Sequence, residues 1–361
     1  MKLGLPRPEA DRIASLCRLH MVLPDASTTL DCDAPEVVER LARTFENPEQ
    51  LDLAFLLGIA DMRALGPATA TGFREALLCR AWAAVRRHLG GRDSEAAIHA
   101  EVARRREMLR ASIGRDPARD AWLDALGDKL PDRVILSFPP EQLLRLILAL
   151  HQVRTAGPRV WIEPLPAGQR DSTGAAPEYE VFYLGFDEVG LLSRLSGGMA
   201  LEGLTIQEAR IFSLPENLVL DQFRVVVLGA QDALSAAALS DLAHRLTRAA
   251  SDPTIAARVQ RRAGAFLRSR TGRMDAEVDN ASLPDRSIFR VIGPDAPGLL
   301  HFLADIFFRH GINVTGAIVT TEGAVARDTF FVEWSAAGGK VLDPEAIRRV
   351  LRAISSLRVP I

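Results

Sequence analysis

The feature that most constrains the fold of this chain is an ordered series of structural signals over residues 287–357. The apolar and polar spacing predicts a half-buried strand, a helix, two more strands and a second helix, at residues 288–292, 299–310, 312–320, 329–334 and 344–357. Gly311 stands where the first of these helices should end. This order predicts two helices packed on one face of an antiparallel sheet.

The same order recurs earlier in the chain. Its signals are a strand at residues 179–186, a turn into a helix at 187–192, a strand opening at 203–206, a strand at 219–228 and a helix at 231–249. When the copies are aligned, Asp187 falls beside Asp295 and Gly190 beside Gly298. Residues 221–223 (DQF) fall beside residues 328–330 (DTF). Two copies with matching turn residues are stronger evidence for this fold than one copy alone.

The first third of the chain carries only helical patterns. Helices are predicted at residues 8–23, where Pro24 should end the first one, and at 36–45, 49–65, 73–89 and 95–113. Residues 116–177 are predicted to contain a helix at 122–130, a helix from Pro139 to Val153, a strand at 159–163 and a Pro- and Gly-rich linker. Residues 274–278 are expected to add a fourth strand to the first repeat. The predicted fold class is α+β, an all-α region followed by two ferredoxin-like βαββα modules.

Composition narrows the class of protein. The chain has 361 residues, of which 48% are hydrophobic and 25% charged, with a formal net charge of −2. Such a balance gives no electrostatic reason to expect nucleic acid or an anionic membrane as a partner. No apolar run has transmembrane length, so we expect a cytoplasmic protein. The three cysteines lack C-x-x-C spacing, which favours reduced, mostly buried thiols over a disulfide or zinc site.

The two glycine turns are the candidate binding sites. A glycine just before a helix lets a ligand approach the backbone, and the free N–H groups of the first helical turn can hold a carboxylate. Two modules side by side would bring each turn near the strand openings of the other, forming sites for an amino acid. The candidate effector-binding residues are Asp187, Gly190, Leu191, Asp295, Pro297, Gly298, Leu299 and Asn313. Of these, Asp295 and Asn313 are expected to meet the polar groups of the same ligand at the module interface. The alternative is that the D-x-x-G-L-L stretch is only a turn that links a strand to a helix and binds no ligand.

Several stretches resemble a known family. Residues 293–300 (GPDAPGLL) resemble the D-R-P-G-L-L turn of ACT regulatory domains, and residues 311–314 (GINV) resemble the start of their second strand. Residues 324–332 (AVARDTFFV) are similar to the third strand of the ACT modules that end the bacterial PII uridylyltransferase/uridylyl-removing enzymes. In the first copy Val189 replaces the usual proline. The resemblance implies tandem ACT modules, a role in nitrogen regulation, and glutamine as the effector.

The helical region resembles another part of the same enzymes. Residues 53–67 (LAFLLGIADMRALGP), with the helix that follows, look like the end of their HD phosphohydrolase domain. The resemblance implies four parts: an HD-domain remnant at 1–115, a connector at 116–177, a first ACT module with its linker at 178–280, and a second ACT module at 281–361.

Catalytic residues of that family are not found in the sequence. Its metal-binding His and His-Asp residues belong upstream of the matched segments, Thr29 and Leu30 replace an expected Arg-Arg pair, and no G-S…D-x-D arrangement exists. Only His20 and Asp61 could belong to a metal centre, and a hydrolytic centre needs several converging ligands. We interpret Asp61 as a structural carboxylate, paired with Arg63 or capping a loop, and His20 as a polar residue at a helix end. No cofactor is expected unless a catalytic partner brings Mg²⁺ or Mn²⁺.

Two functions of different classes remain open. The first is a noncatalytic, glutamine-sensing regulatory portion of a PII uridylyltransferase/uridylyl-removing enzyme, either a truncated product or one half of a split enzyme. The alternative is an enzyme that retains the uridylyltransferase or the uridylyl-removing phosphodiesterase activity. Expected partners are glutamine or another amino acid, and PII protein or a separate catalytic chain. The basic run at residues 104–106 is either a solvated helix face or a docking surface for an acidic protein.

Overall fold

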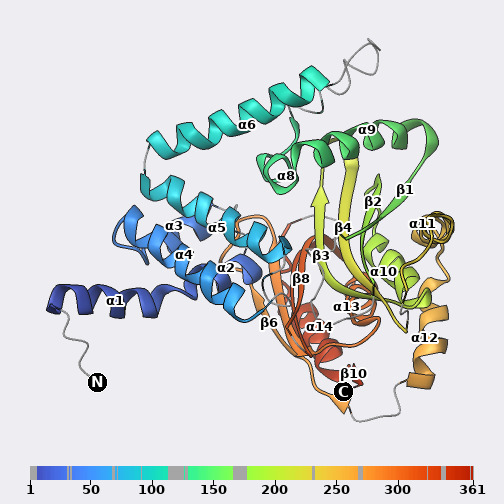
Figure 1. Cartoon of the computed structure of the whole chain (residues 1–361). Coiled ribbons are helices and arrows are strands. Elements are labelled where there is room, and N and C mark those ends of the chain that lie inside the picture. The colour runs from blue at the N-terminus through green and yellow to red at the C-terminus, as the bar shows by residue number, and fades with distance from the viewer. Residues whose placement is uncertain are drawn as a thin grey trace. The chain divides into compact units, whose positions relative to one another are not determined.

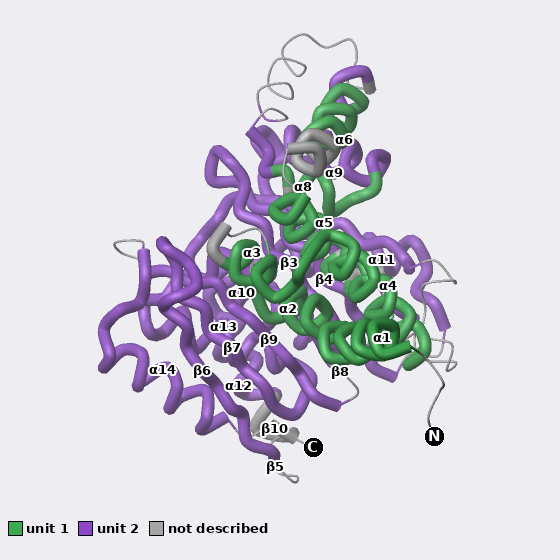
Figure 2. The backbone as a smooth tube through the Cα atoms, turned by 90° about the vertical axis from the view of Figure 1, so that its left-hand side faces the viewer, with its two compact units in different colours: residues 1–108, 132–139 green, residues 109–131, 140–361 purple. Residues whose placement is uncertain are grey.

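The computed structural model describes residues 6–30, 32, 35–66, 70, 72–90, 92–112, 126, 129–165, 177–229, 232–266, 271–322, 324–334, 339–357 and 359–360. The chain divides into two compact units (Figure 2): residues 1–108 with 132–139 form unit 1, and residues 109–131 with 140–361 form unit 2. Helices and an antiparallel sheet are both present, which confirms the α+β class. No helix within the described ranges is both long and apolar enough to span a lipid bilayer.

The described part of unit 1 is helical. Its helices are α1 (Arg7–Leu19), α2 (Val22–Thr29), α3 (Pro35–Ala42), α4 (Pro48–Ala64), α5 (Gly72–Gly90) and α8 (Asp132–Ser137), and α6 (Arg92–Ser112) begins here. Helix α5 contacts α2, α3, α4 and α8 and buries Leu78 and Val85 in the core of the unit. The start of α4 is fixed by Asn47, whose side chain accepts a hydrogen bond from the backbone N–H of Gln50.

Pro24 does not end the first helix. Helix α1 already ends at Leu19, and Pro24 is the third residue of α2, which continues to Thr29. A proline is tolerated there because the N–H groups of the first helical turn have no partner within the helix. The helices expected at 36–45, 49–65, 73–89 and 95–113 are confirmed as α3 to α6. The helix expected at 122–130 lies mostly outside the described residues.

The burial of the cysteines differs from the prediction that they are mostly buried. Only Cys32 is buried, whereas Cys17 and Cys79 are exposed.

Unit 2 is organised around an eight-stranded sheet with the order β1-β2-β4-β3-β8-β9-β7-β6, in which neighbouring strands are antiparallel (Figure 1). The first repeat consists of β2 (Glu178–Phe186), α10 (Leu191–Leu201), β3 (Leu204–Ser213), β4 (Leu218–Val227) and α11 (Ala236–Ala250). The second consists of β7 (Ser287–Pro294), α13 (Leu299–Arg309), β8 (Ile312–Glu322), β9 (Val325–Trp334) and α14 (Pro344–Ser356). Both copies therefore have the βαββα order that the sequence predicts.

The two repeats join edge to edge in the middle of the sheet. Strand β3 of the first pairs with β8 of the second, with Ala209 opposite Val319, and helix α10 packs against α13. One apolar core runs through both repeats; within it the Phe307 ring lies 5.3 Å from Phe289 and 5.0 Å from Phe330. Because β3 and β8 are antiparallel, the turn of each repeat faces the beginning of the second strand of the other.

The outer strands of the sheet correct one prediction. Residues 274–278 were expected to extend the first repeat, but β6 (Asp275–Asp279) pairs with β7 of the second. The fourth strand of the first repeat is β1 (Arg159–Pro164), which pairs with β2 and lies in the predicted connector. Each repeat thus completes its free edge with the segment that precedes it, because a short connection between antiparallel neighbours closes the edge at little entropic cost.

Further helices cover the sheet. Helix α9 (Pro140–Ala156) contacts β2; the Arg145 guanidinium lies 4.9 Å from the centre of the Trp161 ring. The neighbouring residues Val160 and Ile162 point to the opposite face and join the core under α11. Helix α12 (Ile255–Phe266), which the sequence did not predict, packs against α10, and a small β5–β10 pair joins residues 271–272 to 359–360.

Candidate functional site

The two turns after β2 and β7 have the same backbone conformation. Gly190 and Gly298 both have φ 82° and ψ 5°, and they are the N-cap residues of α10 and α13. This left-handed conformation costs a residue with a Cβ more than it costs glycine. Glycine also has no side chain to cap the helix, so the N–H groups of the first helical turns receive no side-chain cap. Each turn therefore presents a helix N-terminus that favours negative charge.

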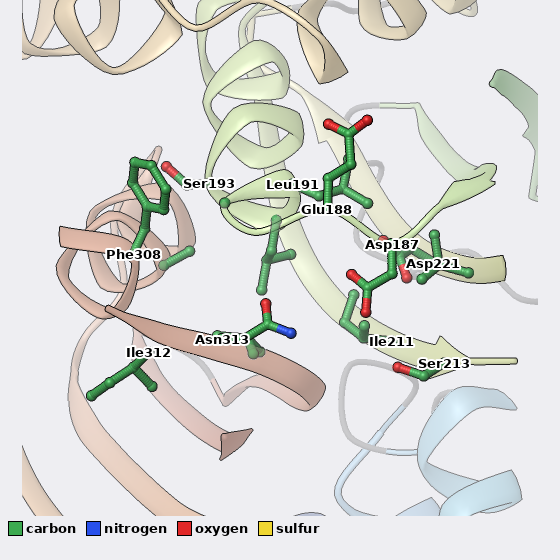
Figure 3. A pocket seen from close by; sticks show the side chains of 15 residues that line it. Asp187, Glu188, Leu191, Ser193, Ile211, Ser213, Asp221, Phe308, Ile312 and Asn313 are labelled. Carbon is green, nitrogen blue, oxygen red and sulfur yellow. The ribbon is translucent and has the colours of Figure 1, made fainter. Parts of the chain in front are cut away.

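The turn of the first repeat opens onto a pocket that contains residues from both repeats, hereafter the first pocket. Asp187, Gly190, Ile211 and Asp221 come from the first repeat, and Phe308 and Asn313 from the second (Figure 3). Its cavity volume is about 20 Å³, roughly the room that one water molecule needs. In this structure the pocket is nearly closed.

The turn of the second repeat forms an equivalent pocket, hereafter the second pocket. Asp295, Gly298 and Asp328 stand where the first pocket has Asp187, Gly190 and Asp221, and Leu204 and Ile206 at the start of β3 complete it. Its cavity volume is about 10 Å³. Both pockets therefore combine the turn of one repeat with the second-strand opening of the other.

The structure separates two residues that were expected to act together. Asn313 was predicted to meet the same ligand as Asp295, but it lines the first pocket together with Asp187 and Gly190. Pro297 is exposed and does not line either pocket. Of the other predicted residues, Leu191 lines the first pocket and Leu299 the second. The antiparallel β3–β8 junction causes this exchange, because each second strand begins beside the turn of the other repeat.

Sequence reasoning missed the buried carboxyl group in each pocket. Asp221 and Asp328 are 2% and 3% exposed, and the Oδ1 atom of each has no hydrogen-bond partner. Burial, and next the nearby carboxylate of Asp187 or Asp295, raises the pKa of each group well above its usual range. The aligned DQF and DTF stretches placed these residues in register. A polar residue in the middle of a buried strand was the signal that could have identified them.

The contact between the two repeats contains a buried histidine. His301 of α13 is fully buried, its Nδ1 lies 2.8 Å from the Ser193 carbonyl oxygen of α10, and its Nε2 has no partner. Burial lowers the pKa of His301, so the neutral ring with a proton on Nδ1 fits this environment. Gly197 makes room for the ring, because a Cβ there would lie 2.7 Å from Nδ1.

Comparisons with known proteins bear on the whole chain. No family model and no solved structure matches it. The bifunctional uridylyltransferase/uridylyl-removing enzyme of Gluconobacter oxydans is 29% identical over 369 residues, which cover 97% of this chain and 36% of that protein. The same enzyme of Caulobacter vibrioides is 29% identical over 95% of the chain, and that of Rhodospirillum rubrum 25% over 98%. The chain is related to the bifunctional uridylyltransferase/uridylyl-removing enzymes. It spans about a third of the length of these curated relatives, 36 to 37%.

The two candidate metal ligands that the sequence offers, His20 and Asp61, both lie in unit 1. Asp61 is half-buried in α4, and the predicted pairing with Arg63 is not the one observed, because Arg63 donates to Glu75 at 2.7 and 3.1 Å. The Nδ1 atom of His20 lies 2.9 Å from the carbonyl oxygen of Cys17. Among the described residues, no group of three or more His, Cys, Asp or Glu side chains is arranged to hold a metal ion.

The basic run of α6 is engaged within unit 1. Arg104 and Arg105 both donate to Glu101, and Arg105 also donates to the carbonyl oxygens of Ile135 and Phe138. Arg106 pairs with Asp132 at 2.9 Å. These hydrogen bonds attach α6 to α8 and the residue that follows it, and those from Arg104 and Arg105 lower the pKa of Glu101 to about 2. Two of the three arginines therefore have a structural role rather than forming a solvated face.

Proposed function

We propose that this chain is an amino-acid-sensing regulatory unit of the uridylyltransferase/uridylyl-removing system in nitrogen regulation, with glutamine as the effector. In this proposal the two βαββα repeats are ACT modules and the ligand binds at the junction between them. The observation that carries the proposal is the composition of the first pocket, which combines an uncapped helix N-terminus with two neighbouring carboxyl groups.

An α-amino acid carries opposite charges on one carbon atom. Its carboxylate suits the N–H groups and the positive end of the helix dipole at the start of α10. Its ammonium group suits the carboxyl groups of Asp187 and Asp221, which lie close together (Figure 3). Asn313 adds an amide that faces Asp187 across the pocket and is suited to the side-chain amide of glutamine. The chemistry of the first pocket therefore supports a zwitterionic ligand with a polar side chain.

Binding requires the pocket to open. Its present cavity has room for about one water molecule, and the Phe308 ring lies over Gly190, where an added Cβ would be 2.9 Å from Cδ2. Phe308 is 45% exposed, so its ring can turn towards solvent without leaving a packed core. In this proposal, displacement of Phe308 admits the ligand, and the contacts between α10 and α13 transmit its presence.

The test is thermal melting of the chain with millimolar glutamine, glutamate or alanine. Ligand binding stabilises the folded state by about 2.7 kcal/mol at a hundredfold excess over the dissociation constant. We expect glutamine to raise the melting temperature of the wild type more than the other two amino acids do. Gly190→Val and Gly298→Val serve as matched variants, because the first narrows the first pocket and the second narrows the other. A melting temperature that none of the amino acids changes would contradict the proposal.

We also propose that this chain alone neither transfers UMP to PII protein nor removes it. The support is the lack of a metal-binding cluster among the described residues and the engagement of Arg63 with Glu75 beside Asp61. The measurement is UMP transfer and release with purified PII protein in Mg²⁺ and in Mn²⁺. Asp61→Ala should melt as a folded protein and change nothing in either assay. Turnover by the wild type that Asp61→Ala abolishes would show that a working metal site assembles in unit 1.

A further inference from the structure

The two pockets share a backbone but differ in how their carboxyl groups are satisfied. In the second pocket the Thr321 hydroxyl donates a hydrogen bond to Asp295 Oδ2 at 3.1 Å. Ser213 is the equivalent residue of the first pocket, but its hydroxyl donates to the Thr315 carbonyl oxygen at 3.1 Å. Among the residues that the structure describes, no side chain donates to Asp187. The backbone of Glu188 supplies a hydrogen bond to Asp187. The outer aspartate of the first pocket therefore lacks only the side-chain donor that Asp295 has in the second.

A buried carboxyl group lies beside it. Asp221 lines the first pocket beside Asp187 (Figure 3), is 2% exposed and has an Oδ1 atom without a hydrogen-bond partner. Asn313, which faces the same pocket from the other repeat, makes no side-chain hydrogen bond within the described part of the chain. Leaving a buried polar group without a partner destabilises the folded state. The first pocket thus collects a carboxylate without a side-chain donor, a buried carboxyl oxygen without a partner, and an amide that makes no side-chain hydrogen bond within the described residues.

We propose that the first pocket alone is the effector site, and that Asp221, together with Asp187, selects its ligand by binding a protonated amino group. This inference rests on the proposed amino-acid-sensing function, adds Asp221 as the residue that determines specificity, and assigns the second pocket a structural role. The ligand class is a primary α-amino acid with a free ammonium group.

The charges around Asp221 favour a cation. Asp187 and Glu188 lie in the turn, Tyr183 is the cross-strand neighbour of Asp221 on β2, and Glu333 of β9 acts on Asp187. The nearby cation is Arg194 of α10, which is already paired with Glu188 at 2.8 Å. Burial raises the pKa of Asp221, which favours its neutral form in the absence of a ligand. An entering ammonium group stabilises the ionised carboxylate, so the Asp221 proton leaves to solvent as the ion pair forms.

The second pocket lacks these features. The carboxylate of Asp295 accepts a hydrogen bond from the Thr321 hydroxyl. At the start of β3, Thr205 occupies the position that Asn313 has at the start of β8. Asp328 is buried there to the same degree as Asp221 and also has an unpartnered Oδ1, although it accepts a backbone hydrogen bond from Thr320. It is therefore the control position.

The test is isothermal titration of the full chain with L-glutamine, in two buffers of different ionisation enthalpy that report proton release. The proteins are the wild type, Asp221→Asn and Asp328→Asn; asparagine has the shape of a neutral aspartic acid, and thermal melts confirm that both variants fold. We expect one site per chain and release of a proton by the wild type. A charge-assisted hydrogen bond contributes about 1.5–3 kcal/mol, so Asp221→Asn should weaken binding by about tenfold or more. Asp328→Asn should change the affinity less than about twofold, and N-acetyl-L-glutamine should not bind the wild type.

The outcomes separate this inference from the proposed function. Glutamine binding that Asp328→Asn weakens as much as Asp221→Asn, or N-acetyl-L-glutamine binding as tightly as glutamine, would overturn the inference and leave amino-acid sensing in place. A wild type that binds none of the amino acids would overturn both. Tight glutamine binding without proton release, unaffected in Asp221→Asn, would also overturn the role of Asp221.

Discussion

The first and second pockets occupy equivalent positions in the two repeats. They differ in their side chains rather than in their backbone conformation. Both begin at a glycine with φ 82°, and both contain an outer and a buried aspartate. In the second pocket a threonine satisfies the outer carboxylate, whereas in the first the corresponding serine hydroxyl bonds elsewhere. The turn is the same in both repeats. The outer aspartate has a side-chain donor only in the second pocket, whereas the buried aspartate has an unpartnered Oδ1 in both.

The largest expected difference between the pockets comes from adding a Cβ to their glycines. Both glycines have a left-handed φ, which costs about 1–2 kcal/mol for a residue with a side chain. At Gly190 the new Cβ would also lie 2.9 Å from the Phe308 ring, whereas at Gly298 the nearest atom is Ala200 Cβ at 3.4 Å. We expect Gly190→Ala to lower the free energy of unfolding by about 2–4 kcal/mol and Gly298→Ala by about 1–2 kcal/mol, because overpacking adds to strain only at Gly190.

The measurement is urea unfolding of both variants. Adding Phe308→Ala to Gly190→Ala should bring its loss down to that of Gly298→Ala. Equal losses in the two single variants would show that the Phe308 ring does not close the first pocket.

A smaller difference is expected in the dependence of stability on pH. The folded-state pKa of Asp221 and of Asp328 is raised, so each group binds its proton more tightly in the folded than in the unfolded chain. The stability that it contributes is complete below the unfolded pKa, about 3.9, and is lost as pH rises towards the folded pKa. Relative to Asp221→Asn or Asp328→Asn, the wild type should lose up to about 1.4 kcal/mol per pH unit in this window.

Urea unfolding at several pH values between 4 and 8 checks this expectation. Without ligand the two variants should behave alike, because both carboxyl groups are buried to the same degree. Saturating glutamine should then remove the pH dependence attributable to Asp221 and leave that of Asp328. A wild type whose stability follows that of both variants at every pH would mean that neither carboxyl group is protonated when buried.

The smallest expected effect concerns the hydroxyl groups beside the outer aspartates. Burial raises the pKa of Asp295 and the Thr321 hydrogen bond partly opposes that rise, so Thr321→Ala should raise it further, by an amount equivalent to about 0.5–1.5 kcal/mol. Ser213→Ala is the matched control and should leave the pKa of Asp187 unchanged, since the Ser213 hydroxyl bonds to Thr315. Carboxyl-carbon NMR titration measures both. A shift of Asp187 in Ser213→Ala would remove the distinction between the two pockets.

Much of the fold of unit 2 was predictable because its signals are local. Alternation and helical spacing located both βαββα repeats, and the two glycines marked the turn that precedes the first helix of each. The partner of a strand is not a local property. The strand at 159–163 was recognised from sequence but assigned to a linker, and residues 274–278 were assigned to the wrong repeat, because both edges of the sheet were chemically suitable.

The same distinction between local and non-local information applies to the candidate site. The sequence by itself determined the repeat, the glycine turns, the aspartates aligned within it and the α+β class, since each depends on residue type and short-range spacing. Only the tertiary structure decided that Asn313 faces Asp187 rather than Asp295, that Asp221 is buried without a partner, and that Ser213 and Thr321 donate to different acceptors. These facts depend on how β3 pairs with β8 across more than a hundred residues of chain and on which rotamer each hydroxyl adopts, and neither is encoded in any short stretch of sequence.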